Sequence, residues 1–366
     1  MGPANGTHAP VGGLKADPTT DAFYFSLADV CKECMVLGGQ AQVSFANGSR
    51  QDTTAGVYTH HLITTDVGRK SPQLPVTPVC PNGTAAAPPG GASGMGGMGG
   101  MGGMGGMEGA GHSHGRRHSL GRRQDSTVIP GLPEGAASMA ASMFVSSGED
   151  ASPSFYASND PTVKTGFYIA KDDKISGMLE LVNYDNWEKD IYMALDYEYL
   201  PGPREPGWLD VGKGTVNIDG CGGSIDFHPP ADRAVTYNGT DWKIGGDGYV
   251  LNFTPHLHDG AIDVNIFLNG ESICNSKAIY GNGEGKMEVD GEDWETITAY
   301  EPCEKAIKVK KGDIMRLDST YDLTKHRLRP DSQNHEMGAE AMALAAFIFA
   351  LPEEVAATPA DPGHAH

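Results

Sequence analysis

The chain has 366 residues, and its 27 lysines and arginines stand against 47 aspartates and glutamates, for a formal net charge of -20. This length suits two domains or one large β architecture, and this charge repels phosphate backbones and anionic membranes, which argues against a nucleic-acid partner. The longest apolar run, 341–351, is about half of the roughly 20 residues that cross a bilayer, so we expect core and no transmembrane segment.

Two independent features indicate an oxidising, extracellular compartment. There are five Asn-x-Ser/Thr acceptor motifs, at Asn5, Asn47, Asn82, Asn238 and Asn252. There are also six cysteines: Cys31, Cys34, Cys80, Cys221, Cys274 and Cys303. Three disulfides among them would require at least one bridge between the two halves of the chain. We therefore expect a secreted glycoprotein whose signal peptide is absent from the displayed sequence.

A glycine-rich tract at 90–111 interrupts the first half of the chain. It carries methionines at strict three-residue spacing, namely Met95, Met98, Met101, Met104 and Met107, followed by His112, His114 and His118. Glycine at this density costs too much backbone entropy for a core, which predicts a disordered insertion at about 81–135. The tract suits either a plain linker or a Cu(I)-capturing segment. Arg116-Arg117 and Arg122-Arg123 resemble dibasic cleavage sites.

After the insertion the sequence is rich in short strand signals. Strand-like runs are found at 167–170, 178–184, 191–200, 249–258, 261–268 and 272–276. Asp259-Gly260 and Asn269-Gly270 are two-residue hairpin signals, which predicts a three-stranded meander. Pro201-Gly202-Pro203 marks a boundary between a lobe at 20–200 and a lobe at 204–352, with a disordered tail at 353–366. The fold class is therefore all-β.

Two pairs of histidines are the candidate metal ligands. His256 and His258 are two residues apart on an expected strand, so both imidazoles leave the same face and can converge on one ion. His60 and His61 are adjacent, so on a regular strand they would point to opposite faces and approach an ion from nearly opposite sides, an arrangement that suits Cu(I). Met337 can add a soft thioether to the second pair.

Taken in chain order, four short motifs resemble the catalytic core of the copper type II, ascorbate-dependent monooxygenases. They are Thr59-His60-His61-Leu62, Glu180-Leu181-Val182-Asn183-Tyr184, His256-Leu257-His258 and Glu336-Met337. The nearest subgroup is the fungal and plant stress-upregulated nodulin-like secreted proteins. The resemblance implies two consecutive antiparallel, jelly-roll-like β-sandwich lobes, and it favours a strand over a helix at 341–351.

In that family, copper ions bound on the two lobes have different tasks. The resemblance implies that His60 and His61 hold an electron-transfer copper, and that His256, His258 and Met337 form the catalytic, oxygen-activating copper site. The third histidine of the first site aligns with Asn183, a much weaker ligand. Three possibilities follow for that site. It holds Cu(I) with two histidines alone, it recruits His228, His326 or the Met-rich tract as a further ligand, or it is empty.

Three functions remain open from the sequence. The first is a secreted copper-dependent monooxygenase that uses O2 and ascorbate or a similar reductant to hydroxylate a C–H bond. The family's carboxylate clamp for peptides aligns with Thr254 and Ala341, which predicts that the enzyme does not amidate peptides. The second is an extracellular stress protein that binds or sequesters copper without catalysis. The third is a structural glycoprotein with a vestigial fold.

Overall fold

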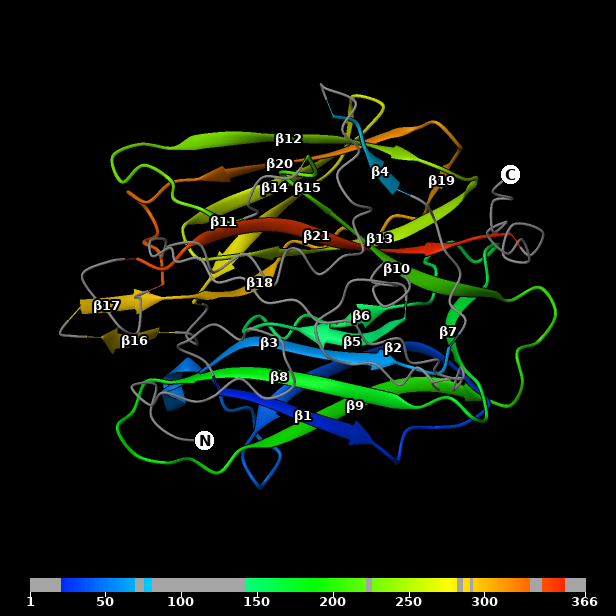
Figure 1. The fold of residues 1–366 in the computed structure, drawn as a ribbon, viewed down its shortest axis with the longest axis horizontal. Coiled ribbons are helices and arrows are strands. Elements are labelled where there is room, and N and C mark those ends of the chain that lie inside the picture. Colours follow the sequence, from blue (N-terminus) through cyan, green and yellow to red (C-terminus); the bar gives the residue numbers. More distant parts are fainter. Residues whose placement is uncertain are drawn as a thin grey trace, which may run out of the picture.

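The computed structural model describes residues 21–69, 76–80, 142–221, 226–281, 286–289, 292–329 and 338–352. Within these ranges the chain forms β-sheets, antiparallel except for one pair of strands, and a single 3₁₀ turn, Thr53–Ala55 (Figure 1). This confirms the all-β prediction. The expected insertion at about 81–135 and the tail at 353–366 lie outside the described residues. No helix among the described residues has the length and hydropathy of a membrane span.

The lower half of Figure 1 is a sandwich made of two sheets. One sheet has the order β1-β8-β3-β5, and it consists of β1 (Asp21–Leu27), β8 (Ile175–Asn183), β3 (Val57–Asp66) and β5 (Met143–Ser147). The other contains β2 (Cys34–Ser44), β9 (Tyr192–Pro201), β7 (Thr165–Ile169) and β6 (Ser154–Phe155). Leu62, Phe144 and Phe167 belong to the apolar core that lies between them.

The upper half of Figure 1 is a second sandwich. Its outer sheet has the order β18-β15-β14-β20-β12-β4, made of β18 (Ile297–Tyr300), β15 (Glu271–Tyr280), β14 (Ala261–Leu268), β20 (Ile314–Tyr321), β12 (Val235–Ile244) and β4 (Val76–Pro78). Its inner layer contains β19 (Ile307–Val309), β13 (Gly248–Leu257), β21 (Ala341–Ala350), β10 (Leu209–Asn217) and β11 (Asp226–Phe227). A separate hairpin pairs β16 (Lys286–Val289) with β17 (Glu292–Glu295).

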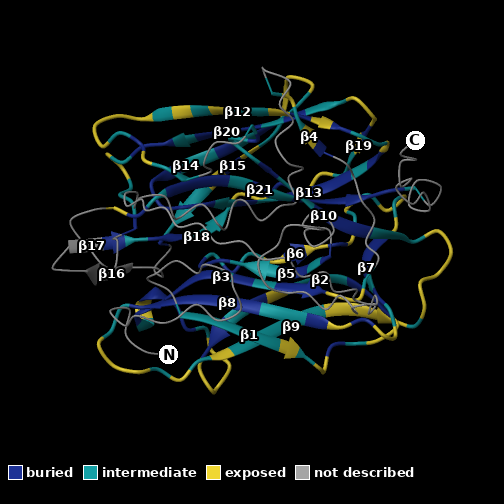
Figure 2. Cartoon of the chain, in the orientation of Figure 1, coloured by how far each residue is buried: buried dark blue, intermediate teal, exposed yellow. Residues whose placement is uncertain are grey.

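One sheet runs through both sandwiches. Its order is β19-β13-β21-β10-β7-β2-β6, and the junction is a parallel pairing in which Leu209 of β10 faces Thr165 of β7. Strand β21 lies in the middle layer and is buried on both faces (Figure 2), with Phe347 in the upper core and Ile348 in the lower core. A nearly continuous apolar run is what such burial requires. The strand expected at 341–351 is therefore confirmed.

One of the two expected hairpins is not formed. Asn269 and Gly270 both adopt positive φ, 53° and 85°, and they join the paired strands β14 and β15 as expected. The turn at Asp259-Gly260, however, joins β13 and β14, which belong to different sheets. The predicted three-stranded meander is wrong, because β21 comes from the far end of the chain to pair with β13.

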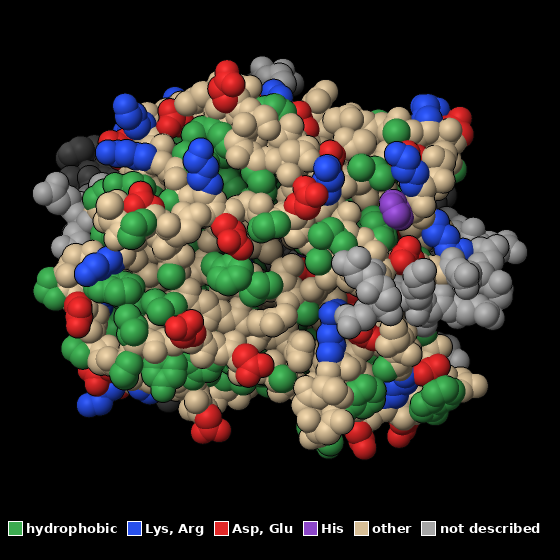
Figure 3. Space-filling model, turned by 180° about the vertical axis from the view of Figure 1, so that it is seen from behind, with side chains coloured by type: hydrophobic (Ala, Val, Ile, Leu, Met, Phe, Trp, Pro, Cys, Tyr) green, Lys and Arg blue, Asp and Glu red, His purple; other side chains and the backbone are tan. Residues whose placement is uncertain are grey.

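The candidate glycosylation sites differ in accessibility. Asn47 and Asn238 are exposed, and Asn5 and Asn82 lie outside the described residues. Asn252 is only 5% exposed, and its Nδ2 donates a hydrogen bond of 2.7 Å to the Phe155 carbonyl. Asn252 therefore links β13 to β6 in the folded protein and is not an accessible acceptor. On the face seen from behind, acidic and basic side chains are interspersed, and hydrophobic ones gather on its lower half (Figure 3).

All six cysteines are paired in disulfides. The bridges are Cys31–Cys34, Cys80–Cys221 and Cys274–Cys303. Cys80–Cys221 is the predicted bridge between the two halves of the chain, and it closes a sequence separation of 141 residues. Closing so long a loop lowers the entropy of the unfolded chain.

Replacing both Cys80 and Cys221 by serine should therefore lower the free energy of unfolding by about 2–5 kcal/mol. Chemical denaturation monitored by tryptophan fluorescence would measure the change. The Cys31→Ser/Cys34→Ser variant is the matched control, because its loop spans a sequence separation of only 3 residues. An equal loss of stability in the two variants would contradict this explanation.

Candidate metal centre

The structure brings the four predicted histidines together. The rings of His60 and His61 have centroids 4.1 Å apart, and His256 and His258 have centroids 5.5 Å apart. Across the junction between the two halves, His60 lies 5.7 Å from His258 and His61 lies 5.1 Å from His256, again measured between ring centroids. The two pairs therefore form one cluster of imidazoles between β3 and the end of β13.

A β-bulge explains how adjacent histidines reach the same place. In the ladder between β3 and β8, Thr59 faces Leu181 and His61 faces Glu180, so His60 is an extra residue on β3. An extra residue breaks the two-residue alternation of side chains and redirects them locally. The expectation that His60 and His61 point to opposite faces is therefore wrong.

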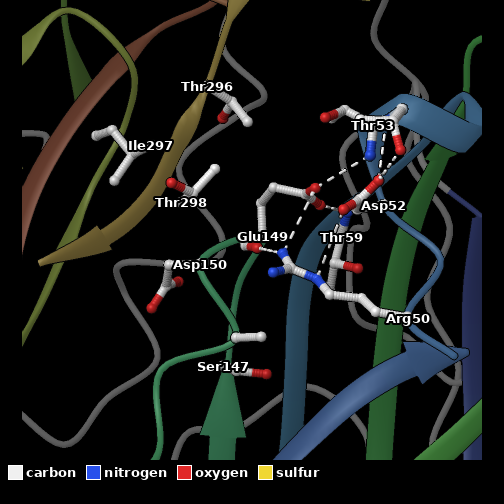
Figure 4. Close-up of polar contacts among 12 residues, drawn as sticks. Arg50, Asp52, Thr53, Thr59, Ser147, Glu149, Asp150, Thr296, Ile297 and Thr298 are labelled. Atoms are coloured by element: carbon white, nitrogen blue, oxygen red, sulfur yellow. Dashed lines mark hydrogen bonds and ion pairs between the residues drawn. The ribbon is translucent and has the colours of Figure 1, made fainter. Parts of the chain in front are cut away.

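A buried carboxylate holds the chain just before this bulge (Figure 4). Glu149 follows the end of β5, and its carboxylate accepts hydrogen bonds from the backbone N–H of Thr59 at 2.7 Å and of Thr53 at 3.2 Å. Arg50 donates to the Glu149 carbonyl, and its Nη2 lies 3.8 Å from Oε1. Burial raises the pKa of Glu149 to about 8, although these donors and Arg50 act in the opposite direction.

The ring nitrogens of His60 and His256 are the strongest sign of a ligand. Both nitrogens of His60 and Nε2 of His256 are buried and have no hydrogen-bond partner among the described residues. Burial, followed by the neighbouring His61, lowers the pKa of both imidazoles well below the usual 6.5. Both rings are therefore neutral at pH 7, which is the form that binds metal ions. Buried polar atoms normally have partners, and a metal ion would supply one.

Two glutamates complete the polar surroundings of the cluster. Oε2 of Glu180 lies 2.9 Å from Nδ1 of His61 and 3.7 Å from Nδ1 of His60. Nδ1 of His258 lies 2.8 Å from the Glu340 carbonyl, to which it donates, and 3.8 Å from Oε1 of the same residue. Potential ligand atoms of His60, His258 and Glu340 lie within 4.8 Å of one another, as do those of His60, His61 and Glu180.

The other sequence candidates do not join this cluster in the described structure. Asn183, aligned with the missing histidine, donates from Nδ2 to the Trp187 carbonyl and accepts from the Asp185 N–H, so its amide organises a turn. The ring of His326 stacks on Tyr280 with a centroid distance of 3.6 Å. Met337 and the Met-rich tract lie outside the described residues. Burial raises the pKa of Asp226, and His228 and His61 both act on that carboxylate in the opposite direction.

Comparison with known proteins finds one family and two relatives that resemble parts of this chain. Residues 223–329, which contain His256 and His258, match the model of the family described as stress up-regulated Nod 19. The chain is also 26% identical over 191 residues to a "probable copper-dependent oxygenase" of a Phoma species, covering 50% of this chain and 45% of that protein. The chain is thus similar, over part of its length, to proteins described as stress up-regulated or as probable copper-dependent oxygenases.

A second relative gives the same result. It is a "probable copper-dependent oxygenase" of Cochliobolus lunatus, 26% identical over 192 residues, which are 50% of this chain and 57% of that protein. The chain thus spans about half the length of the curated relatives it matches. The expected similarity to stress-upregulated nodulin-like proteins is confirmed over residues 223–329, which contain one of the four motifs.

Sequence reasoning missed three glutamates that surround or support the centre. Glu180 and Glu340 precede apolar runs and look like ordinary strand residues, and Glu149 lies in a polar turn that carries no motif. Glu180 is within the motif that contains Asn183. A carboxylate inside or directly before an apolar strand was the available signal for Glu180 and Glu340.

Proposed function

We propose that this protein is a secreted copper-dependent oxygenase with a single copper centre held by His60, His61, His256 and His258. The observation that carries the proposal is the cluster of four imidazoles, two of them on buried residues, in which ring nitrogens of His60 and His256 lack partners among the described residues. Imidazole suits copper, zinc, iron and nickel, and the relatives named as copper-dependent oxygenases favour copper. Three disulfides are consistent with secretion.

Residues around the ligands would orient them. The Glu180 carboxylate accepts from Nδ1 of His61, and the Glu340 carbonyl accepts from Nδ1 of His258, so in each ring Nε2 remains to bind a metal ion. Copper bound there would supply one-electron and O2 chemistry, with ascorbate or a similar reductant. Burial of His60 and His258 keeps water from most of the centre. Met337, one residue before the described segment at 338–352, is proposed as an additional ligand.

The proposed reaction is hydroxylation of a C–H bond in a substrate other than a glycine-extended peptide. Thr254 and Ala341 stand where peptide-amidating relatives carry their carboxylate clamp, and neither side chain carries a positive charge that could pair with a carboxylate. Without that clamp the α-carbon of a peptide's terminal glycine is not oriented for reaction.

Copper storage is the second candidate function. Four imidazoles fill the coordination sphere of a tetrahedral ion, whereas catalytic metal sites keep a position open for water or substrate. The methionines between Met95 and Met107 are also soft donors for Cu(I). Both features favour a protein that binds copper without turning over a substrate.

Copper content and oxygen consumption would separate these functions. We expect the full chain to bind copper and to consume O2 when ascorbate is added, and His258→Ala to lose both properties. His326→Ala is the matched control, because it removes another histidine ring, one that stacks on Tyr280. Tight copper binding without O2 consumption would support storage instead, and absence of stoichiometric copper would refute both functions.

A further inference from the structure

Lys213 is a buried cation with no counter-charge among the residues that the structure describes. It lies on β10, it is 5% exposed, and its Nζ donates a hydrogen bond to the Ser146 hydroxyl on β5. No described carboxylate lies within ion-pair distance of it. Burial alone lowers its pKa to about 8, with no contribution from a neighbouring charge, so the amine is still mostly protonated at pH 7. A buried charge normally has a partner of opposite sign.

Lys213 faces the same space as the metal centre. On β10 Val211 belongs to the lower core and Val216 to the upper core, so alternation turns Lys213 toward the lower sandwich with Val211. On β13 Phe253 and Leu257 belong to the upper core, so His256 also turns downward. Lys213 and His256 therefore project from one face of the middle layer.

The opposing sheet places the histidines of β3 near the lysine. Ser146 pairs with Ile63, and His61 is two residues before Ile63 on the same face of β3. One strand spacing and two residues along the strand separate the Ser146 and His61 positions by roughly 8 Å. The ammonium of Lys213 donates to Ser146. Its distance from the metal centre is therefore one that an acyl chain of several carbon atoms would span.

The side chains between Lys213 and the histidines are mostly apolar and only half-buried. Leu344 and Ala346 of β21 lie between β10 and β13, and Ile63 lies opposite on β3. Asn217 pairs with Leu344, which in turn pairs with His256, and the buried Oδ1 of Asn217 has no hydrogen-bond partner among the described residues. The face that carries Lys213 therefore also carries a buried amide oxygen with no partner among the described residues.

We propose that Lys213 binds the carboxylate of an acid with an apolar chain, whose body lies over Ile63, Leu344 and Ala346 and points toward the histidines. This assignment of a substrate class rests on the proposed oxygenase function, although binding itself does not require copper. The carboxylate would be held several carbon atoms from the reacting C–H bond. A glycine-extended peptide has only one carbon there, in agreement with the loss of the peptide clamp at Thr254 and Ala341.

Binding of octanoate to the copper-free full chain tests the site independently of the metal. Isothermal titration calorimetry should show octanoate binding roughly tenfold or more tightly than uncharged octanamide. Lys213→Met should abolish this preference, and Lys308→Met, which removes an exposed lysine of β19, should keep it. Equal affinities for the two compounds, or an unchanged preference in Lys213→Met, would overturn the proposal.

The thermal stability of Lys213→Met gives a second criterion. Removing a buried charge that has no counter-ion among the described residues should leave the melting temperature unchanged or raise it. A marked decrease would show that the chain supplies its own counter-ion, and the proposal would be wrong. With Cu²⁺ added, relaxation of the octanoate protons should be fastest at the methyl end, and fastest relaxation beside the carboxylate would refute the orientation. If the chain binds octanoate as predicted but no copper, only the oxygenase function fails.

Discussion

Replacing either His60 or His256 by alanine should abolish the binding of the same copper ion. The two residues come from different halves of the chain, yet each ring lies within about 6 Å of rings from the other pair. Each variant should weaken copper binding by more than the roughly 10–100-fold typical of losing an outer-shell partner. Competition with a Cu(I) chelator, together with metal analysis of the dialysed protein, would measure this effect.

The double variant His60→Ala/His256→Ala distinguishes one centre from two. If all four imidazoles bind one ion, the double variant should lose much less affinity than the sum of the two single losses, because either single change already disrupts the site. Two independent sites would instead give two ions per chain in the unmodified protein, and each single variant would retain one. That stoichiometry would contradict the proposed single centre.

The stability of the Glu149→Gln variant relative to the unmodified protein should rise with pH. The pKa of Glu149 is raised from the usual 4.5 to about 8, so between these values the folded state binds a proton that the unfolded state has lost. The unmodified protein therefore loses stability from this group as pH rises from 4.5 to 8, and glutamine does not titrate. The full difference across this window is at most about 5 kcal/mol.

Chemical denaturation of both proteins at several pH values between 5 and 9 would measure this trend. The offset at pH 5 reports the hydrogen bonds to Thr53 and Thr59 that glutamine fails to replace, and the slope reports the titration. Glu188→Gln, an exposed substitution, is the control and should show no slope. A difference that is constant with pH would show that Glu149 is already ionised in the folded protein.

Much of the local structure followed from local sequence patterns. Turn residues and alternating apolar side chains predicted six of the strands, and the type of turn at Asn269-Gly270 follows from residues that tolerate positive φ. Asp259-Gly260 carries a similar signal but joins strands of different sheets, because Asp259 accepts hydrogen bonds from Trp294, Thr296 and Ile297. A local turn signal does not specify which strands become neighbours.

The sequence by itself determined the all-β class, the need for a disulfide between the halves, and the four histidines as candidate ligands, whereas the strand at β21 was indicated only by the family resemblance. Only the tertiary structure decided that these histidines meet in one cluster. Pairing of β13 with β21, over some 90 residues of chain, brings His256 and His258 beside β3. The bulge at His60, the carboxylate of Glu149 beside it, and the approach of Glu180 then set the geometry. Such contacts join residues distant in sequence, so no local spacing can encode them.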